Sequence, residues 1–465
     1  KVEFLFPART PGECPLGSNS WAVAGSRTAS GRPLLANDPH VVYTIPGMWY
    51  LAHLKAPGLD VAGATIPGLP GVALGHNQWI AWGGTFLAYD VQDLYLEDLD
   101  PLTGRYVFRG QIEQADLERE TISVKGQRPV ELNRWVTRHG PVIADEGNRF
   151  PALRWVGAES GFARLLLDLN RARNWQEFTG ALAHYSGPGQ NFVYADVDGN
   201  IGYQAAGRFP IRRTHLGDVP ADGSSGNFEW DGFIPFDELP RVYNPPSGVI
   251  ASANQDPFPS GYPYRVSGRF YPPYRSGQIT ALLSAQQGWR AMDMLKVQTD
   301  VYSAFSHRLA RQFVAAYDRS GAGNSALADA AAILRTWNGQ MEVEAAAPLI
   351  VSLAYEHLRR AVGERACPGK AADFTSFMVT AALERLLEER PPGWFEDWDR
   401  LLVEVLSGAL EEGRRMQGRD PREWKYGRHH TLLVAHAMGH QVPVLRRHFD
   451  IGPVPMSGSP TTVKK

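Results

Sequence analysis

This chain of 465 residues has few cysteines, no long apolar run and almost no excess of either charge. It has two cysteines, Cys14 and Cys367, which permit one disulfide but exclude a cysteine zinc cluster, since such sites need several ligands at short spacing. No apolar run approaches the roughly 18 residues that span a bilayer. Lys+Arg 47 against Asp+Glu 49 gives a net charge of −2, so the chain lacks the cationic excess typical of nucleic-acid-binding proteins.

The apolar content, by contrast, is large enough for a substantial core. Hydrophobic residues make up 43% of the chain, which excludes intrinsic disorder and a disulfide-stapled mini-scaffold. The 47 Gly, 34 Pro and 13 Trp indicate many turns around an aromatic-rich interior. At roughly 150 residues per domain, the length predicts about three domain-sized units.

The first half of the chain is predicted to be mainly β-structure. Short apolar runs between Gly, Pro and Asn-Asp turns predict strands over residues 18–160 and again over 190–255. The run 128–142 alternates apolar and charged residues, as a half-exposed strand does. Residues 163–184 change to helical spacing. In the second strand region, Asp198-Gly199 between two apolar runs predicts a hairpin.

The second half is mainly helical. From about residue 277 to 416 the chain is rich in Ala, Leu, Arg and Glu, and the last fifty residues return to strands and turns. A layout of strands, then helices, then strands predicts an α+β fold. The predicted helices span 277–285, 291–317, 323–337, 344–363, 370–390 and 397–416.

One junction suggests chemistry. Gly17-Ser18 joins a turn-rich segment to an apolar strand, and most such dipeptides are simply strand starts. The functional alternative is that cleavage after Gly17 frees Ser18 to act with its own α-amine. A serine hydroxyl needs a base to become a nucleophile, and an α-amine, with a pKa near 8, can serve as that base at neutral pH.

The sequence around and after this junction resembles the β subunit of the penicillin acylases. These are N-terminal-nucleophile hydrolases that mature by cutting themselves before such a serine. The similar blocks follow in the family's order from residue 18 almost to the end. They are SNSWAV (18–23), GRPLLANDPH (31–40), GMWY (47–50), PGLPG (67–71), GHNQWIAWG (75–83), YADVDGNIGY (194–203), IASAN (250–254) and GPVPM (452–456).

The resemblance implies a role for five residues. Ser18 matches the nucleophile and its freed amine the base. The backbone N–H of Phe86 and the side chain of Asn254 match the two oxyanion donors, which stabilise charge on a tetrahedral intermediate. His40 lies where the family has His or Gln near the nucleophile. Arg275 resembles an arginine that supports the active site and its asparagine.

Other interpretations stay open for some of these residues. Asn254 taken alone is typical of a turn, and His40 of a hydrogen-bonded loop histidine. A glycoside hydrolase would also be aromatic-rich and would need two carboxylates such as Asp196 and Asp198, although acidic residues in an Asp-Gly turn are usually turn formers. The remaining rival is an unprocessed, catalytically silent member, because Ser18 has no α-amine while it remains in a peptide bond.

The resemblance also implies a structural calcium. Its ligands would be the Asp90 and Asp93 carboxylates and the Gln92 carbonyl, with the Pro210 carbonyl as a further ligand, and such hard oxygen donors suit Ca²⁺. A usual acidic ligand of the family comes from the α subunit. The acidic residues equally suit a solvated turn. No organic cofactor is expected.

The predicted activity is that of an amide hydrolase, an acylase that removes an N-acyl side chain. The acyl pocket is expected to include Trp49, Tyr50, Phe86 and Tyr89. These apolar and aromatic residues favour a phenylacetyl or aliphatic acyl group over a charged one, so we expect a β-lactam or an N-acyl-homoserine lactone as substrate. The partner implied is an α subunit from the same precursor, with neither nucleic acid nor membrane binding, and the location implied is periplasmic or secreted.

These expectations divide the chain into four parts. Residues 1–17 are expected to be a spacer or α-subunit tail ahead of the cleavage site. Residues 18–276 would form the catalytic sheet core, 277–416 a helical region and 417–465 a return to the core that is incomplete at its C-terminus. The fold implied is the αββα sandwich of N-terminal-nucleophile hydrolases with a large helical insertion.

Overall fold

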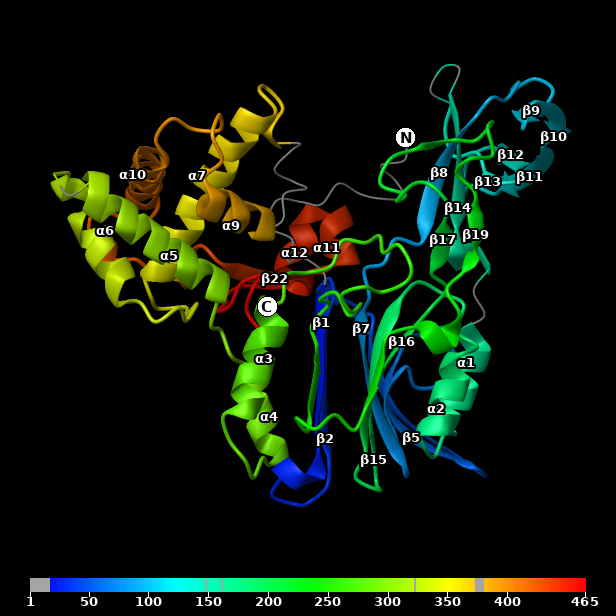
Figure 1. Ribbon diagram of the computed structural model, residues 1–465, viewed down its shortest axis with the longest axis horizontal. Helices are drawn as coiled ribbons and strands as arrows, with labels where there is room; N and C mark the ends of the chain where they lie inside the picture. The colour runs from blue at the N-terminus through cyan, green and yellow to red at the C-terminus, as the bar shows by residue number, and fades with distance from the viewer. Residues whose placement is uncertain (1–16, 146, 148, 160–161, 322, 373–379) are drawn as a thin grey trace.

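The computed structural model describes residues 17–145, 147, 149–159, 162–321, 323–372 and 380–465. Two β-sheets lie face to face, and helices cover the outer side of each, so that the main body has four layers (Figure 1). A helical block and a small β lobe extend from one end of these layers. Among the described residues, no helix combines the length and apolar content needed to cross a membrane.

The larger sheet has seven strands in the order β20-β16-β15-β7-β6-β5-β4. The predicted Asp198-Gly199 hairpin is confirmed, since β15 and β16 pair antiparallel with Tyr194 opposite Gly202. In sheet order the strands are β20 (Arg241–Tyr243), β16 (Ile201–Ala206), β15 (Gln190–Asp196), β7 (Ile80–Phe86), β6 (Leu74–Asn77), β5 (Leu59–Thr65) and β4 (Tyr50–Ala56).

The smaller sheet has β1 (Gly17–Val23) between β2 (Leu34–His40) and β21 (Val249–Ser252). Side chains alternate across a strand. Trp21 and Val23 pack toward the covering helices, whereas Ala22 packs between the two sheets. The same alternation directs the Ser18 side chain into the space between the sheets.

Helices close both outer faces. On the seven-stranded sheet, α1 (Phe162–Leu169) and α2 (Trp175–Leu182) bury an apolar stripe, and the side chain of Asn174 caps the first turn of α2. On the three-stranded sheet, α3 (Tyr274–Ser284) and α4 (Met294–Gln298) pack against β1. The result is the αββα sandwich that the resemblance implies.

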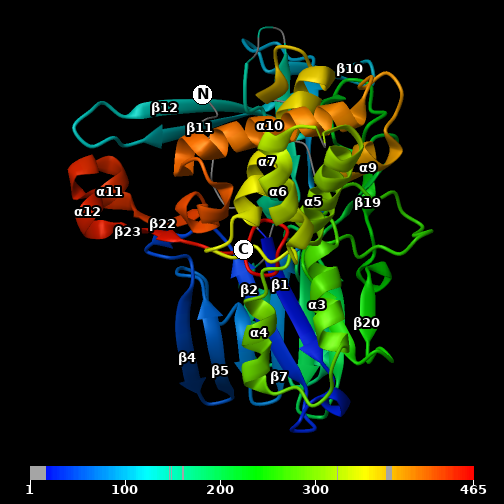
Figure 2. The ribbon, with the colours of Figure 1, turned by 90° about the vertical axis from the view of Figure 1, so that its left-hand side faces the viewer.

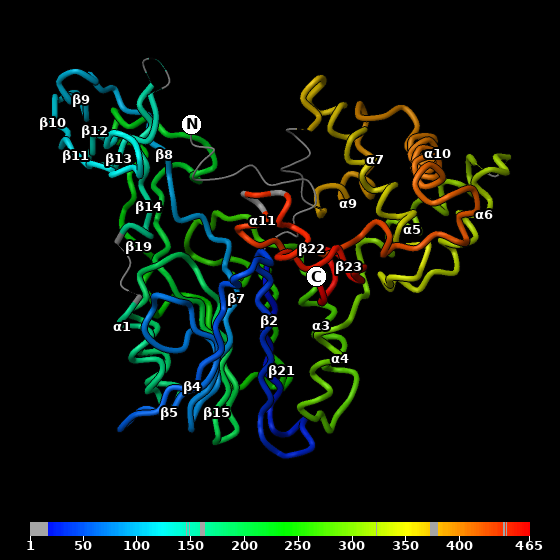
Figure 3. The backbone as a smooth tube through the Cα atoms, turned by 180° about the vertical axis from the view of Figure 1, so that it is seen from behind, coloured from blue at the N-terminus to red at the C-terminus, as the bar shows by residue number. Residues whose placement is uncertain are grey.

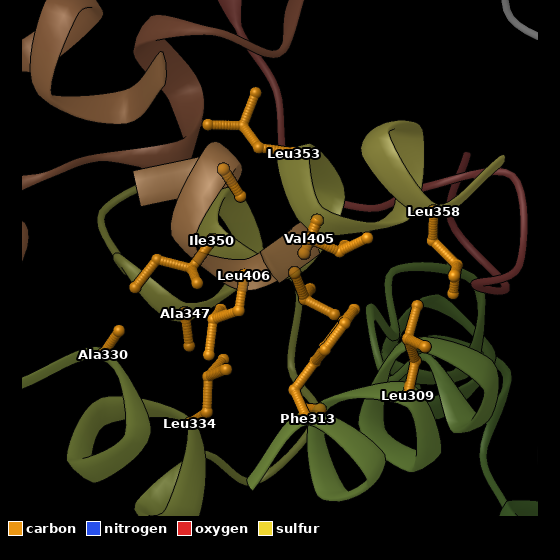
Figure 4. Close-up of a cluster of buried hydrophobic side chains, with 14 of the residues drawn as sticks. Leu309, Phe313, Ala330, Leu334, Ala347, Ile350, Leu353, Leu358, Val405 and Leu406 are labelled. Atoms are coloured by element: carbon orange, nitrogen blue, oxygen red, sulfur yellow. The ribbon is translucent and has the colours of Figure 1, made fainter. Parts of the chain in front are cut away.

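The helical block has its own apolar core, part of which is drawn in Figure 4. The predicted helix over 291–317 is interrupted, because the Ser303 hydroxyl accepts from the N–H of Ser306 and starts a new helix. The break separates α4 from α5 (Ala304–Ala316). Because α3 and α4 both pack against β1, they belong to the sandwich rather than to the helical block. The block contains α5, α6 (Ser325–Thr336), α7 (Ala347–Ala366), α9 (Thr380–Glu389) and α10 (Trp398–Gln417).

The small β lobe carries the exposed strands. The alternating run at 128–142 forms β12 (Val130–Thr137) and β13 (Gly140–Pro141). β12 pairs with β11 (Asp116–Ile122) in a hairpin that projects from the body (Figure 2). The other strands of the lobe are β8 (Gln92–Glu97), β9 (Arg105–Phe108), β10 (Gln111–Gln114), β14 (Phe150–Trp155), β17 (Pro210–Arg212), β18 (Ala221–Asp222) and β19 (Trp230–Phe233).

The C-terminal residues come back to the sandwich. β22 (Thr431–His436) pairs with β23 (Ile451–Pro455) and with the short β3 (Thr44–Ile45). Two short helices that the sequence did not predict, α11 (Ala437–Gln441) and α12 (Arg446–Phe449), lie between β22 and β23. The chain end reaches the neighbourhood of β1 and β2 (Figure 3).

Candidate active site

Ser18 lies one residue into the central strand of the smaller sheet and is buried, with 7% of its surface exposed. Its hydroxyl donates to the carbonyl oxygen of Gly17 at 2.5 Å. Its backbone N–H, which belongs to the Gly17-Ser18 peptide, donates to Asn254 Oδ1 at 2.7 Å. The serine is therefore poised beside its own preceding peptide bond. Residues 1–16, including Cys14, lie outside the described residues.

Asn254 adopts a backbone conformation that is rare for a non-glycine residue, with φ of 68°. This turn follows β21 and directs the side chain toward Ser18. Two donors, Ser18 N and Arg275 Nη2, meet its Oδ1 at 2.7 and 2.8 Å. The orientation of the amide is thereby determined, and Nδ2 is left to donate to the Phe86 carbonyl at 2.7 Å.

Phe86 ends β7, and its backbone is turned toward this site. Leu87 N–H donates to Gly189 O at 3.0 Å, and hydrogen-bonded and non-hydrogen-bonded pairs alternate along an antiparallel ladder. The Phe86–Gln190 pair is therefore non-hydrogen-bonded, and the Phe86 N–H points away from β15. Phe86 itself is 46% exposed. Strand alternation turns its side chain to the face of β7 that carries Trp82, opposite the face of Thr85, so it is the backbone of Phe86 that meets Asn254.

Arg275, in the first turn of α3, joins the parts of the site. It is 2% exposed and donates to four acceptors, the carbonyls of Ser18 and Ala253 and the Oδ1 atoms of Asn19 and Asn254, at 2.7–2.8 Å. Charge-assisted bonds of this kind are about twice as strong as neutral ones. Asn19 was not predicted as a site residue, and only its position next to Ser18 could have indicated it.

His40 lies on the helix-covered side of the smaller sheet. It pairs with Gly17 across the β1–β2 ladder, so strand alternation turns its ring to the face opposite the Ser18 hydroxyl. Its Nε2 is 2.8 Å from Asp38 Oδ2. Burial lowers the pKa of His40, although Asp38 opposes this effect. The neutral form of the ring is therefore favoured relative to an exposed histidine.

A buried polar network that the sequence analysis did not identify supports the end of β7. Tyr203 OH donates to Asn191 Oδ1 at 2.5 Å. Asn191 Nδ2 in turn donates to Thr85 Oγ1 at 3.0 Å and to the Phe86 carbonyl at 3.3 Å. Thr85 and Ser252 share a hydroxyl–hydroxyl bond of 2.7 Å, which ties the two sheets together beside the site.

The four residues predicted for the acyl pocket are not gathered in one place. Tyr89 is 3% exposed and packs in the core between the sheets, with its ring 4.8 Å from that of Phe209. Tyr50 is 67% exposed on β4, the edge strand of the larger sheet. Trp49 directly precedes that edge strand. Phe86 alone of these four lies against Asn254.

The predicted calcium ligands are in contact with an arginine and do not surround an empty coordination site. Arg212 Nε lies 2.9 Å from Asp93 Oδ2, and the Pro210 carbonyl accepts from the Tyr89 hydroxyl at 3.2 Å. Within the described residues, no three His, Cys, Asp or Glu side chains gather as a metal-binding group. A calcium ion needs 6–8 oxygen ligands, so this donor set does not fit one.

Asp196, a candidate carboxylate for glycoside hydrolysis, is engaged in hydrogen bonds within a turn. Asp196 Oδ1 accepts from the N–H groups of Asp198 and Asn200 at 3.0 and 2.9 Å, and its Oδ2 accepts from Tyr194 OH at 2.7 Å. This carboxylate holds the β15–β16 turn.

Comparisons with known proteins identify the family of the chain. A family model described as penicillin amidase matches residues 1–465. The chain is 28% identical over 503 residues to the acyl-homoserine lactone acylase QuiP of Pseudomonas aeruginosa, covering 96% of this chain and 59% of that protein. It is 31% identical over 466 residues to the penicillin acylase 2 proenzyme of Pseudomonas sp. strain SE83, covering 96% and 58%.

A solved structure matches as well. The thermostable penicillin G acylase from Alcaligenes faecalis superposes with a TM-score of 0.76 at 25% identity, over 87% of this chain and 80% of that chain. The expected N-terminal-nucleophile hydrolase fold is thereby confirmed. The chain spans 58–59% of the length of the two curated relatives named above. With the family model matched from end to end, the chain belongs to the penicillin amidase family.

Proposed function

We propose that this chain carries the catalytic centre of an N-acyl amide hydrolase whose nucleophile, Ser18, is released by self-cleavage at Gly17-Ser18. The observation that carries the proposal is the arrangement around this peptide. The Ser18 hydroxyl touches the Gly17 carbonyl oxygen at 2.5 Å, while Asn254 Oδ1 holds the peptide N–H at 2.7 Å. Before cleavage, Ser18 Oγ thus has the Gly17 carbonyl carbon as its target. After cleavage, the α-amine released from the same peptide would serve as its base.

Self-cleavage would proceed as an N-to-O acyl shift. Ser18 Oγ attacks the Gly17 carbonyl carbon and the C–N bond breaks. The departing nitrogen keeps its own hydrogen and takes the proton lost by the Ser18 hydroxyl, so that it becomes the Ser18 amine. Water then hydrolyses the ester between Gly17 and Ser18 Oγ, restoring the hydroxyl and leaving Gly17 with a free carboxylate. Arg275, bonded to the Ser18 carbonyl at 2.8 Å, would hold the strand in register throughout.

Turnover would use the same oxygen. Ser18 Oγ attacks the substrate amide carbon while the α-amine takes its proton, and the amine returns a proton to the leaving nitrogen before water hydrolyses the acyl-enzyme. The Phe86 N–H and Asn254 Nδ2 would bind the oxyanion. Two directed donors stabilise developing charge, and removing one such donor typically costs about 10²–10³ in kcat.

Replacing Ser18 by alanine tests both halves of the proposal. Intact-mass measurement of the full protein should show a species beginning at residue 18 in the wild type and only uncut chain in Ser18→Ala, with amide hydrolysis abolished. Ser20→Ala is a matched control, because Ser20 lies two residues further along the same strand face and is also buried. Cutting or hydrolysis that survives in Ser18→Ala would overturn the assignment. A wild-type chain that stays uncut would favour the catalytically silent alternative.

The proposed substrates are β-lactam side-chain amides and N-acyl-homoserine lactones, in keeping with the names of the two relatives. The burial of Ser18 and Asn254, 7% and 0% exposed, favours an apolar acyl group, because burying an unpaired charge is costly. A turnover screen of phenylacetyl, octanoyl, dodecanoyl and glutaryl amides tests this choice. Preference for the glutaryl amide would contradict it.

We further propose an α subunit as partner and export to the periplasm or beyond. The relatives are longer than this chain by about two fifths of their own length. The edge strand β4 exposes an apolar side chain on each face, Tyr50 and Leu51, 67% and 80% exposed, and a partner at this edge would cover them. Co-purification of two fragments after cleavage, and recovery of activity from a periplasmic extract, would test these points.

A further inference from the structure

Arg212, the last residue of β17, occupies the place where the family resemblance predicts a calcium ion. Its Nε approaches both oxygens of Asp93, at 3.2 and 2.9 Å. Its Nη2 donates to the Asp90 backbone carbonyl at 2.9 Å and lies 3.8 Å from Asp90 Oδ1. One guanidinium therefore contacts both predicted carboxylate ligands, and it does so from a different strand of the same lobe (Figure 1).

The pair is deeply buried, since the side chains of Arg212 and Asp93 are 3% and 1% exposed. Asp93 also accepts from the indole N–H of Trp230, and His215 Nε2 lies 3.4 Å from the same carboxylate oxygen. The N–H groups of Arg212 and Trp230 thus occupy the oxygens of Asp93, and donors of this kind oppose a metal ion at the same oxygens.

The remaining space is closed by backbone. Gly217, with φ of +82°, packs so closely that a Cβ there would collide with Asp93 Oδ1 and Arg212 Nε. The Pro210 carbonyl, the fourth predicted ligand, already accepts from Tyr89. A calcium ion with its waters would have to displace all of these groups. Two buried cations a few ångströms apart would also repel each other strongly.

We propose that the Arg212 guanidinium serves as a built-in cation at this position and that the protein holds no structural calcium there. An ion in this place would join the acidic turn before β8 to the carbonyl at β17. Arg212 makes the same connection with a covalently attached charge, its Nε shared between the two Asp93 oxygens and its Nη2 on the Asp90 carbonyl. This inference is independent of which amide, if any, the chain hydrolyses.

Metal analysis and thermal unfolding of the full protein, together with any α subunit it is purified with, test the proposal. We expect substoichiometric calcium after dialysis, and a Tm that differs by less than about 1 °C between EDTA and millimolar calcium chloride, because a ligand raises Tm only when it binds the folded state. Stoichiometric calcium that is lost in Asp93→Asn, or a Tm that falls by several degrees in EDTA and is restored by calcium, would overturn it.

Variants of the two neighbouring arginines separate this role from an ordinary ion pair. Arg212→Met should lower Tm by several degrees, because it leaves Asp93 buried without its cation. Arg213→Met is the matched control: Arg213 pairs with Asp231 at the surface, where both side chains are over 40% exposed, and its loss should move Tm by about 1 °C or less. Equal effects of the two substitutions would contradict the proposal. If Arg212→Met fails to fold, the wild-type metal content and EDTA response decide the question alone.

Discussion

His139 is the centre of the most enclosed titratable cluster in the β lobe, and replacing it gives a stability prediction with a definite pH dependence. Its ring nitrogens lie 2.8 Å from Glu97 Oε1 and 2.8 Å from Glu229 Oε1. The side chains of His139 and Glu97 are fully buried, and Glu229 is 16% exposed. Because each ring nitrogen faces a carboxylate, the arrangement favours the doubly protonated, cationic ring.

The direction of the pH effect follows from this geometry. Burial opposes the charged ring, but the hydrogen bonds to Glu229 and Glu97 outweigh it and raise the pKa of His139 above its ordinary value of 6.5. A group whose pKa is higher in the folded state stabilises the fold fully below its unfolded pKa. That contribution is lost as the pH rises through the folded pKa.

We therefore expect His139→Gln to destabilise the protein most at pH 6. The substitution leaves the Glu97 carboxylate buried without its cation, and breaking such a pair typically costs about 3–5 kcal/mol. Urea unfolding followed by circular dichroism, at pH 6 and at pH 9, measures the difference in unfolding free energy between wild type and variant. The difference should shrink at pH 9, because above the ordinary pKa of 6.5 folding has to take up a proton on this ring.

An exposed pair supplies the control. His53 Nε2 lies 2.7 Å from Asp60 Oδ1, but the two side chains are 59% and 27% exposed, so His53→Gln should cost about 1 kcal/mol or less. The reasoning is refuted if the His139→Gln difference is the same at pH 6 and pH 9, or if it is no larger than that of His53→Gln.

Two further substitutions test the site and the helical block. Tyr203→Phe removes the hydroxyl that donates to Asn191 Oδ1 and so weakens the support of the Phe86 peptide. An unsatisfied buried acceptor costs about 1–3 kcal/mol. Initial-rate kinetics should therefore show kcat falling about tenfold with KM unchanged. An unchanged kcat would show that this hydrogen-bond network does not support catalysis. Asp397→Ala removes the cap that accepts from Arg400 N–H at 2.9 Å, and chemical unfolding should show a loss of about 1 kcal/mol, whereas Asp397→Asn should keep most of it.

Much of the fold was predictable because its signals are local. The strand runs and the Asp198-Gly199 hairpin follow from periodicity and turn residues, and both are present. The helical stretch at 163–184 is present as two helices, because Asn174 caps a second one. The predicted helix over 291–317 was wrong at its middle, where Ser303 caps a second helix. The short helices between β22 and β23 were missed because four or five residues carry too little periodicity to be recognised.

The site was predictable only in part. The family resemblance named Ser18, Phe86, Asn254 and Arg275, and the structure brings these four together. Asn19 and the Tyr203–Asn191 pair were not named, since neither has a local pattern that distinguishes it from an ordinary strand residue. Their importance arises from burial and from bonds to distant partners.

The sequence by itself determined which residues alternate along β1, and so which side of the sheet Ser18 faces, because a strand has a fixed period of two. It also determined the capping and turn residues that begin and end the elements. Only the tertiary structure decided what each buried polar group meets. Arg275 reaches Ser18 across 257 positions of the chain, and Arg212 reaches Asp93 across 119. A buried charge is stable only beside its partner, and that partner is chosen by the packing of the layers.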